Sequence, residues 1–360
     1  MRQVALFALL VLAGPVGLRS EPSAAVLFQS QSANTGEWSA DTRTTWNDTD
    51  GEPRIQFNLR TSAGDSRWGF GVRLRDLAGL PPAAVANMAN DVQFSWTREA
   101  GTFRFNGSFD QGRGSGTYTF TPDQGFISNM ATAGYKNLST DDIVRLAVID
   151  VTLAHVRGLA QAGYPNLSLD DVVRTRIHRV TPEFVRDLAA IGYKGIGVDD
   201  LIRMGIHGAT PANIRALQAQ GVRGLSVDEL IKFRIHKVTP EFIRALEARG
   251  YKNIPVDDLV KMRIHRVTAE EMDQLKTLGF GGMDLDMFVK FRIHRVTPDY
   301  IRQMKDVGFV TVSEDQLVKM RIHKVDAQFV RDARADGFSI QSPGDAVDLA
   351  IHGRRWRRRG

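Results

Sequence analysis

The first third of the chain alternates hydrophobic and polar residues. From about residue 26 to 121 the apolar positions follow a period of two, as in Ile55, Phe57 and Leu59. This period is typical of half-buried antiparallel strands, and turn-forming segments such as Glu99-Ala100-Gly101 separate the runs. We therefore predict an antiparallel β domain over residues 26–121, built as a sandwich or a barrel.

After residue 121 the pattern changes to a tandem repeat of 29 residues. In the copy that begins at Ser226, Ser226 and Glu229 have the spacing of a capping box, which predicts a first helix over residues 227–236. Thr239-Pro240 then begins a second helix, and Gly250 ends it. Each unit is therefore a helical hairpin. The glycines that mark the period are Gly134, Gly163, Gly192, Gly221, Gly250, Gly279, Gly308 and Gly337.

Two columns of apolar residues run through the repeats and predict a core shared by neighbouring hairpins. No polar residue enters either column. The first consists of Val148, Ile177, Ile206, Ile235, Ile264, Ile293, Ile322 and Ile351. The second consists of Met130, Leu159, Leu188, Leu217, Leu246, Leu275, Met304 and Ala333.

Helices of about ten residues are too short to be stable alone, so stacking between the repeats must stabilise them. The predicted fold class is thus a multidomain α+β chain, in which the β domain is followed by an αα-solenoid of about eight hairpins. The solenoid is expected over residues 122–353 and an Arg-rich tail over residues 354–360.

The N-terminus has the pattern of an export signal over residues 1–25. Arg2 precedes an unbroken apolar run from Val4 to Ala13, and small residues follow. No later run reaches the roughly 20 apolar residues that a membrane helix needs. We therefore expect an exported protein, periplasmic or secreted, with an uncleaved membrane anchor as the alternative.

Composition excludes several kinds of chemistry. The chain has no cysteine, which rules out disulfides, thiolate-ligated zinc, iron–sulfur clusters and thiol nucleophiles. Five of the six net positive charges lie in residues 354–360 and the sixth in residues 1–25, so the rest of the chain is neutral. The basic character therefore belongs to the ends of the chain and does not predict a nucleic-acid partner.

Seven of the eight histidines occupy one column of the repeat, at the end of the first helix. Neighbouring helices pack about 8–10 Å apart, whereas zinc ligands lie about 2 Å from the ion, so adjacent members of this row do not share a metal. We predict no metal and no cofactor, and expect each imidazole to bond backbone groups in the turn. Sensing of pH is the alternative. The row comprises His178, His207, His236, His265, His294, His323 and His352.

Basic residues form two further columns on the first helices, which together we call the basic stripe. One interpretation is a groove for an acidic protein or an anionic envelope polymer. The other is a structural role, in which the bases complement the helix dipoles and pair with a column of aspartates that includes Asp199 and Asp228. No aromatic residues interleave with the bases, as a nucleic-acid platform requires. The stripe consists of Arg174, Arg203, Lys232, Lys261, Lys290 and Lys319, with Arg176, Arg234, Arg263, Arg292 and Arg321.

Several features of the β region have a functional and a structural interpretation. The tryptophans at positions 38, 46, 68 and 96 form either a platform for a sugar or lipid, or the core, which we expect. The run Gly112-x-Gly114-x-Gly116 lacks the Lys-Ser/Thr pair of a phosphate loop and is expected to link strands. Membrane contact is expected only through the Arg tail or an uncleaved signal.

The repeat sequences Arg234-Ile235-His236-Lys237-Val238-Thr239-Pro240 and Arg292-Ile293-His294-Arg295-Val296-Thr297-Pro298 resemble those of exported bacterial proteins of unknown function. They are also similar to repeats that extend the extracytoplasmic end of membrane metallopeptidases of the beta-lactam-sensor type. The segment from Gly101 to Pro122 looks like the same arrangement. The resemblance implies a sensory or interaction context. The peptidase part, with its His-Glu-x-x-His motif, is absent, so the resemblance assigns no catalytic residue.

These observations favour a non-enzymatic scaffold or sensory protein of the cell envelope. The alternative is a hydrolase-type enzyme with its site in the β domain or at its junction with the solenoid, using Asp41, Asp48, Asp50 or Glu52. No paired carboxylates, serine triad or metal cluster can be assembled from the sequence. We therefore predict no catalytic residues.

Overall fold

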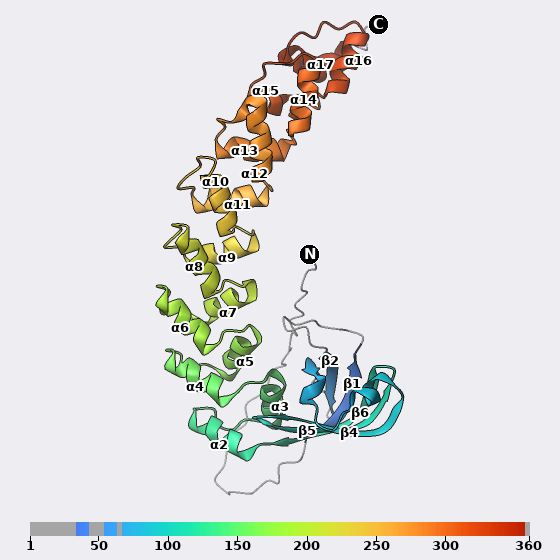
Figure 1. The fold of residues 1–360 in the computed structure, drawn as a ribbon, viewed down its shortest axis with the longest axis vertical. Coiled ribbons are helices and arrows are strands. Elements are labelled where there is room, and N and C mark those ends of the chain that lie inside the picture. Colours follow the sequence, from blue (N-terminus) through green and yellow to red (C-terminus); the bar gives the residue numbers. More distant parts are fainter. Residues whose placement is uncertain (1–33, 43–53, 63–66, 357–360) are drawn as a thin grey trace.

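The computed structural model describes residues 34–42, 54–62 and 67–356, without the side chains of residue 34 and residues 354–356. It consists of a six-stranded antiparallel sheet followed by a long stack of helices, which confirms the predicted fold class (Figure 1). The predicted signal over residues 1–25 lies outside the described residues, as do Trp46, Asp48, Asp50 and Glu52.

All strands of the sheet pair antiparallel, in the order β3-β2-β1-β6-β5-β4. A short 3₁₀ turn, Leu74–Asp76, and helix α1, Pro82–Ala86, connect the two edge strands. The strands are β1 (Asn34–Asp41), β2 (Arg54–Thr61), β3 (Arg67–Arg73), β4 (Ala89–Arg98), β5 (Gly101–Asp110) and β6 (Arg113–Pro122).

The sheet curls around an aromatic core until its two edges meet. Phe70 of β3 stacks on Trp96 of β4 with ring centroids 4.8 Å apart, although these strands stand at opposite ends of the strand order. A single bridge between Ala78 and Ser95 joins the segment after β3 to β4. The β domain is thus one curled, barrel-like sheet, which decides between the two predicted architectures.

Trp38 lies inside the curled sheet, and its indole ring explains why glycines occur in the run Gly112-x-Gly114-x-Gly116. Its side chain is buried, and its Nε1–H donates to the carbonyl of Asn106 at 3.1 Å. A Cβ atom on Gly114 would lie 2.7 Å from the indole ring, and one on Gly107 would lie 2.8 Å from it. The run therefore belongs mostly to β6, where glycine makes room for the indole. Because Trp96 is buried as well, the core interpretation of these two tryptophans is correct.

Sixteen α-helices, α2 to α17, follow the sheet in the described part of the chain, and a π-helical turn, Lys276–Phe280, extends α12. The helices up to α9 are α2 (Gln124–Thr132), α3 (Thr140–Ile149), α4 (Leu153–Gln161), α5 (Leu169–Ile177), α6 (Pro182–Ala190), α7 (Val198–His207), α8 (Pro211–Ala219) and α9 (Val227–Ile235). The others are α10 (Pro240–Glu247), α11 (Val256–Ile264), α12 (Ala269–Leu275), α13 (Leu285–His294), α14 (Pro298–Asp306), α15 (Glu314–Ile322), α16 (Ala327–Ala335) and α17 (Pro343–Trp356).

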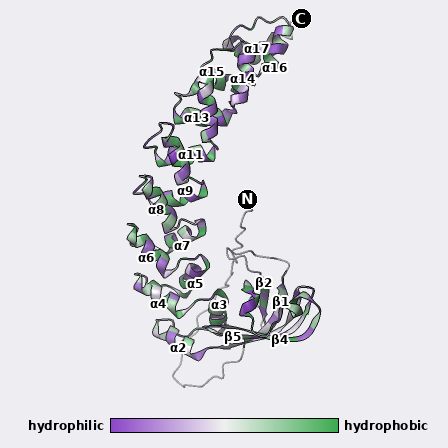
Figure 2. Cartoon of the chain, viewed as in Figure 1, coloured by the Kyte–Doolittle hydropathy of each residue, from purple (hydrophilic) through white to green (hydrophobic). Residues whose placement is uncertain are grey.

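The helices stack in two columns, odd-numbered on odd-numbered and even-numbered on even-numbered. The predicted caps are present: the Ser226 hydroxyl accepts from the amide of Glu229 at 3.2 Å, and the Glu229 carboxylate accepts from the amide of Ser226 at 2.7 Å. Thr239 caps α10 by accepting from the amide of Phe242 at 3.2 Å. Figure 2 shows hydrophobic and hydrophilic segments along the whole stack, as expected for helices that share a core.

Of the two predicted core columns, the one that contains Leu246 is buried in every repeat. The prediction for the Ile235 column is wrong: apart from Val148, its members are between 43% and 52% exposed. Phe233 lies in the core in its place. Ile235 comes seven residues after the exposed Asp228, which is two helical turns, so the two residues share the outer face. The buried column consists of Leu146, Thr175, Met204, Phe233, Met262, Phe291 and Met320.

The sheet and the first repeats form one continuous core. Helix α3 packs on β3, β5 and β6, and a single hydrophobic cluster extends from Trp38 to Val173 in α5. Val148, which is buried, lies in this helix, α3, and so belongs to the repeat that packs on the sheet. The solenoid is therefore anchored directly on the β domain without an intervening linker.

Candidate binding surface

The odd-numbered helices expose three parallel rows of side chains. In α9 these are Asp228 in the first turn, Lys232 in the middle and Ile235 at the end. Because the repeat is regular, the stack carries an acidic row, a basic row and an apolar row side by side. A row whose side chains form ion pairs or hydrogen bonds within the chain is less free to contact another molecule, so these contacts are described row by row.

The first column of the basic stripe pairs with the acidic row of the next repeat. Arg174 contacts Asp199 at 2.9 Å and Arg203 contacts Asp228 at 2.6 Å. The hydrogen bond from Lys261 lowers the pKa of Asp286 below its ordinary value. Three further pairs follow the same spacing: Arg145 with Asp170, Lys232 with Asp257 and Lys261 with Asp286. Much of this column therefore neutralises aspartates of its own chain.

Four of the five arginines in the second column of the stripe bond to the preceding repeat. The Nε–H groups of Arg292 and Arg321 donate to the carbonyls of His265 and His294, at 3.1 and 3.3 Å. Arg263 reaches the carbonyl of His236 in the same way. At the front of the stack, Arg176 donates to the carbonyl of Asp150 and pairs with its carboxylate. Arg234, also in this column, is exposed beside Gly208.

The histidine row lies next to these arginines, but the arginines bond to the backbone carbonyls of the histidines and not to their rings. Among the described residues, no ring of this row donates to or accepts from the backbone, and Nδ1 of His178 is buried without a partner. Burial of the ring and the nearby Arg174 lower the pKa of His178. No group of three or more possible metal ligands is found in the described parts of the chain. The expected contacts of the imidazoles with the turn backbone are therefore not seen.

A ladder of tyrosines, which the sequence analysis did not single out, connects the repeats on another side. The hydroxyl of Tyr193 donates to the carbonyl of Leu225 at 2.8 Å, and that of Tyr164 donates to the carbonyl of Ile196 at 2.6 Å. Tyr135 and Tyr251 make the same contact 32 residues along. These tyrosines follow the periodic glycines directly, which is the signal that would have found them.

The apolar row is the feature of this face that the sequence analysis placed incorrectly. We call its half-exposed members the isoleucine row: Ile177, Ile206, Ile235, Ile264, Ile293, Ile322 and Ile351. Two residues further along, the chain turns through the left-handed region at Arg179, Gly208, Lys237, Arg266, Arg295 and Lys324. An apolar row bordered by cations thus follows the solenoid over at least five repeats.

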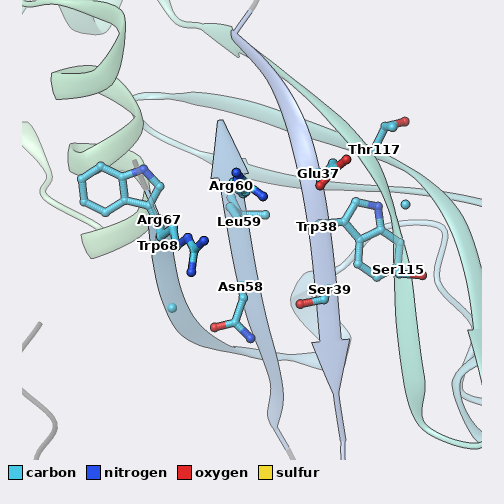
Figure 3. A pocket seen from close by; sticks show the side chains of 12 residues that line it. Glu37, Trp38, Ser39, Asn58, Leu59, Arg60, Arg67, Trp68, Ser115 and Thr117 are labelled. Atoms are coloured by element: carbon cyan, nitrogen blue, oxygen red, sulfur yellow. The ribbon is translucent and has the colours of Figure 1, made fainter. Parts of the chain in front are cut away.

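The β domain carries one candidate site, a shallow hollow of about 850 Å³ on the outer face of β1, β2, β3 and β6 (Figure 3). Glu37, Ser39, Asn58 and Arg60 line it, together with Arg67. One acid among hydroxyl, amide and guanidinium groups provides no pair of carboxylates for hydrolysis.

Of the four carboxylates named for the enzyme alternative, the structure describes Asp41 alone. Asp41 lies at the end of β1, 3.8 Å from Arg113, and it does not line the hollow. The other three carboxylates of the enzyme alternative fall outside the described residues.

Comparisons with known proteins give no indication of function, so the surface of the odd-numbered helices is the main guide to it. A scan against protein-family models finds no match for this chain, and a search of curated proteins finds none either. In the described residues, no helix has the length and apolar character that crossing a membrane requires.

Proposed function

We propose that this chain is a non-enzymatic interaction protein of the cell envelope, in which the solenoid presents an extended binding surface and the β domain caps its front end. The observation that carries the proposal is the repetition on the odd-numbered helices, where half-exposed isoleucines recur at every repeat from α5 onward. Solenoids use repeated surfaces of this kind to bind extended partners.

The export pattern of residues 1–25 and the resemblance of the repeats support an envelope context, periplasmic or secreted. The partner is a protein or an anionic envelope polymer. Within the basic stripe, Arg234, Lys290 and Lys319 are the members that contribute most, because they are exposed and no acidic partner within ion-pair distance is seen among the described residues. The paired members of the stripe contribute structure to the repeat stack.

Affinity capture from envelope extract tests this function, with bound components identified by mass spectrometry. One variant alters the odd-helix face through Lys290→Gln, Lys319→Gln and Ile264→Ser. A matched control alters exposed positions of the even-numbered helices through Arg186→Gln, Arg215→Gln and Arg302→Gln. All three proteins are checked for the same helical circular dichroism.

We expect at least one component that the wild type and the control capture and that the odd-face variant loses. Its capture should also decrease with added salt, because exposed charges are screened over about 8 Å at physiological ionic strength. If every captured component is retained equally by all three proteins, the odd-helix face is not the binding surface and the proposed function is wrong.

A further inference from the structure

The isoleucine row is apolar surface that the fold leaves uncovered. Ile235, Ile264 and Ile293 are each about half exposed, whereas the neighbouring core residues Phe233 and Phe291 are buried. A single exposed apolar residue is ordinary in a soluble protein, but the same residue exposed at one position of successive repeats forms a regularly spaced row.

Positive charge without an internal partner remains beside this row. The acidic and basic rows of the same face pair with each other across repeats, as Arg203 does with Asp228. For the side chains of Lys237, Arg266, Arg295 and Lys324, no hydrogen bond or ion pair is seen in the part of the chain that the structure describes. A partner that follows the isoleucine row would therefore meet unneutralised cations.

These cations occupy backbone positions whose conformation glycine adopts more readily than any residue with a side chain. Their φ angles lie between 56° and 60°, in the left-handed region that disfavours residues with a Cβ atom. Gly208 adopts φ 67° at the same position of its repeat, so the fold accepts glycine there. The turn geometry therefore does not require a long basic side chain, and we look for its purpose at the surface.

The spacing of the row fits an extended polypeptide. Neighbouring helices pack about 8–10 Å apart, and a polyproline II segment presents the same face every three residues, or about 9.3 Å. The row is one residue wide and follows a stack that changes direction along its length in Figure 1. A flexible chain can follow that course, whereas a flat bilayer cannot contact all of it.

From this geometry we infer that the isoleucine row and its bordering cations bind an extended acidic polypeptide segment, with an apolar residue at every third position and carboxylates between. The inference rests on the proposed function and names the partner of the same surface. Apolar side chains of the segment lie against the isoleucines, and its carboxylates pair with Lys237, Arg266, Arg295 and Lys324.

The test uses the peptide (Leu-Pro-Glu)₆ as its probe, with (Leu-Pro-Lys)₆ and a scrambled peptide of the same composition as controls. Binding to the full chain is measured by fluorescence anisotropy. Arg354, Arg355, Arg357, Arg358 and Arg359 are replaced by Gln in every protein, so that the charges of the tail do not contribute. Vesicles of phosphatidylserine and of phosphatidylcholine provide the membrane comparison.

We expect the acidic peptide to bind the parent chain at least tenfold more tightly than either control peptide. The variant Ile235→Ser/Ile264→Ser/Ile293→Ser and the variant Lys237→Gln/Arg266→Gln/Arg295→Gln/Lys324→Gln should each weaken binding at least tenfold. A matched control removes two exposed apolar side chains elsewhere, Met88→Ser/Val310→Ser, and should leave binding unchanged.

Equal binding of the acidic and scrambled peptides would overturn the inference, and so would equal binding by the row variants and the Met88/Val310 control. Binding to phosphatidylserine vesicles that depends on the row, without peptide binding, would assign the surface to membranes and also overturn it. If the peptide does not bind but an envelope component still requires the odd-helix face, the partner named here is wrong while the proposed function stands.

Discussion

The guanidinium of Arg292 donates to the backbone carbonyl of His265, one repeat earlier, at 3.1 Å. The same side chain contacts Glu271 at 3.2 Å, and that carboxylate is only 12% exposed. A residue that the sequence presents as part of a basic surface thus reaches from α13 to the preceding hairpin and satisfies two groups there, a carbonyl at the end of α11 and a carboxylate of α12. The regular ends of the odd-numbered helices depend on such contacts.

Replacing Arg292 by Ala should therefore destabilise the stack. The substitution removes a hydrogen bond to a helix-end carbonyl and leaves a largely buried carboxylate unpaired, so we expect a loss of about 1–3 kcal/mol in the free energy of unfolding. Urea titration followed by circular dichroism measures the loss. Hydrogen exchange should show reduced protection in both α11 and α13.

Arg302→Ala is the matched control, because Arg302 pairs with Asp299 on the same exposed helix surface. Such pairs contribute between about 0 and 1 kcal/mol. Equal destabilisation by the two substitutions would mean that Arg292 is a surface cation like any other.

Phe233 and Ile235 should respond in opposite ways to truncation. Phe233 is 1% exposed and Ile235 is 51% exposed. We expect Phe233→Ala to cost about 3–5 kcal/mol through the cavity that it leaves. Ile235→Ala should change stability by no more than about 0.5 kcal/mol. Denaturation of the two variants under the same conditions checks this, and a larger loss at Ile235 would contradict the observed burial.

The period and the caps of the repeat could be predicted because they are local. Ser226, Glu229 and Thr239-Pro240 satisfy amides of their own helices, so the sequence alone identifies both helix starts. The orientation of each helix against its neighbours is not local. Both Phe233 and Ile235 are apolar in sequence, and only the relation of Ile235 to Asp228, two turns earlier, indicates that it lies outside.

The β domain shows the same division. Alternation identifies the strand that carries Ile55, Phe57 and Leu59, whereas β1 has few apolar residues besides Trp38 and lacks this signal. The curl of the sheet depends on contacts between distant strands, such as Phe70 with Trp96. In the candidate surface, the internal partners of Arg203 and Arg292 lie in neighbouring repeats, so the sequence pattern alone left the structural and binding interpretations open.

Gly114→Ala should disrupt the β domain. A Cβ atom at this position would lie 2.5 Å from the ring of Phe109 and 2.7 Å from that of Trp38, and both rings are confined in the core. We expect a loss of about 1–3 kcal/mol from overpacking, together with a change in tryptophan fluorescence.

Gly71→Ala serves as the control for Gly114→Ala, since its Cβ atom would lie 3.6 Å from the nearest atom, Cδ of Arg54, in the same sheet. This substitution should be tolerated. An unchanged fluorescence spectrum and unchanged stability for Gly114→Ala would show that the indole does not occupy the space above β6.

His155 introduces a pH dependence into the first repeats. Its ring is buried, and Nε2 lies 3.0 Å from the hydroxyl of Thr175, which itself donates to the carbonyl of Val172. Burial, together with the positive charge of Arg176, lowers the pKa of His155 from 6.5 to about 4. The folded state therefore keeps this ring neutral at pH values where the unfolded chain already binds a proton.

Stability should consequently decrease as the pH falls from about 6.5 to about 4, because the unfolded state binds more protons over that interval. The contribution of this histidine is on the order of 2–3 kcal/mol.

Other repeats place Phe and Met at these two positions, as in Phe242 and Met262, so His155→Phe/Thr175→Met should remove the contribution and keep the packing. Urea midpoints are measured between pH 4.5 and 7.5. Toward acidic pH the midpoint of the wild type should decrease more than that of the variant, and above pH 7 the difference between the two midpoints should stay constant. Parallel pH profiles for the wild type and the double variant would show that His155 titrates normally and that the acid sensitivity arises from other groups.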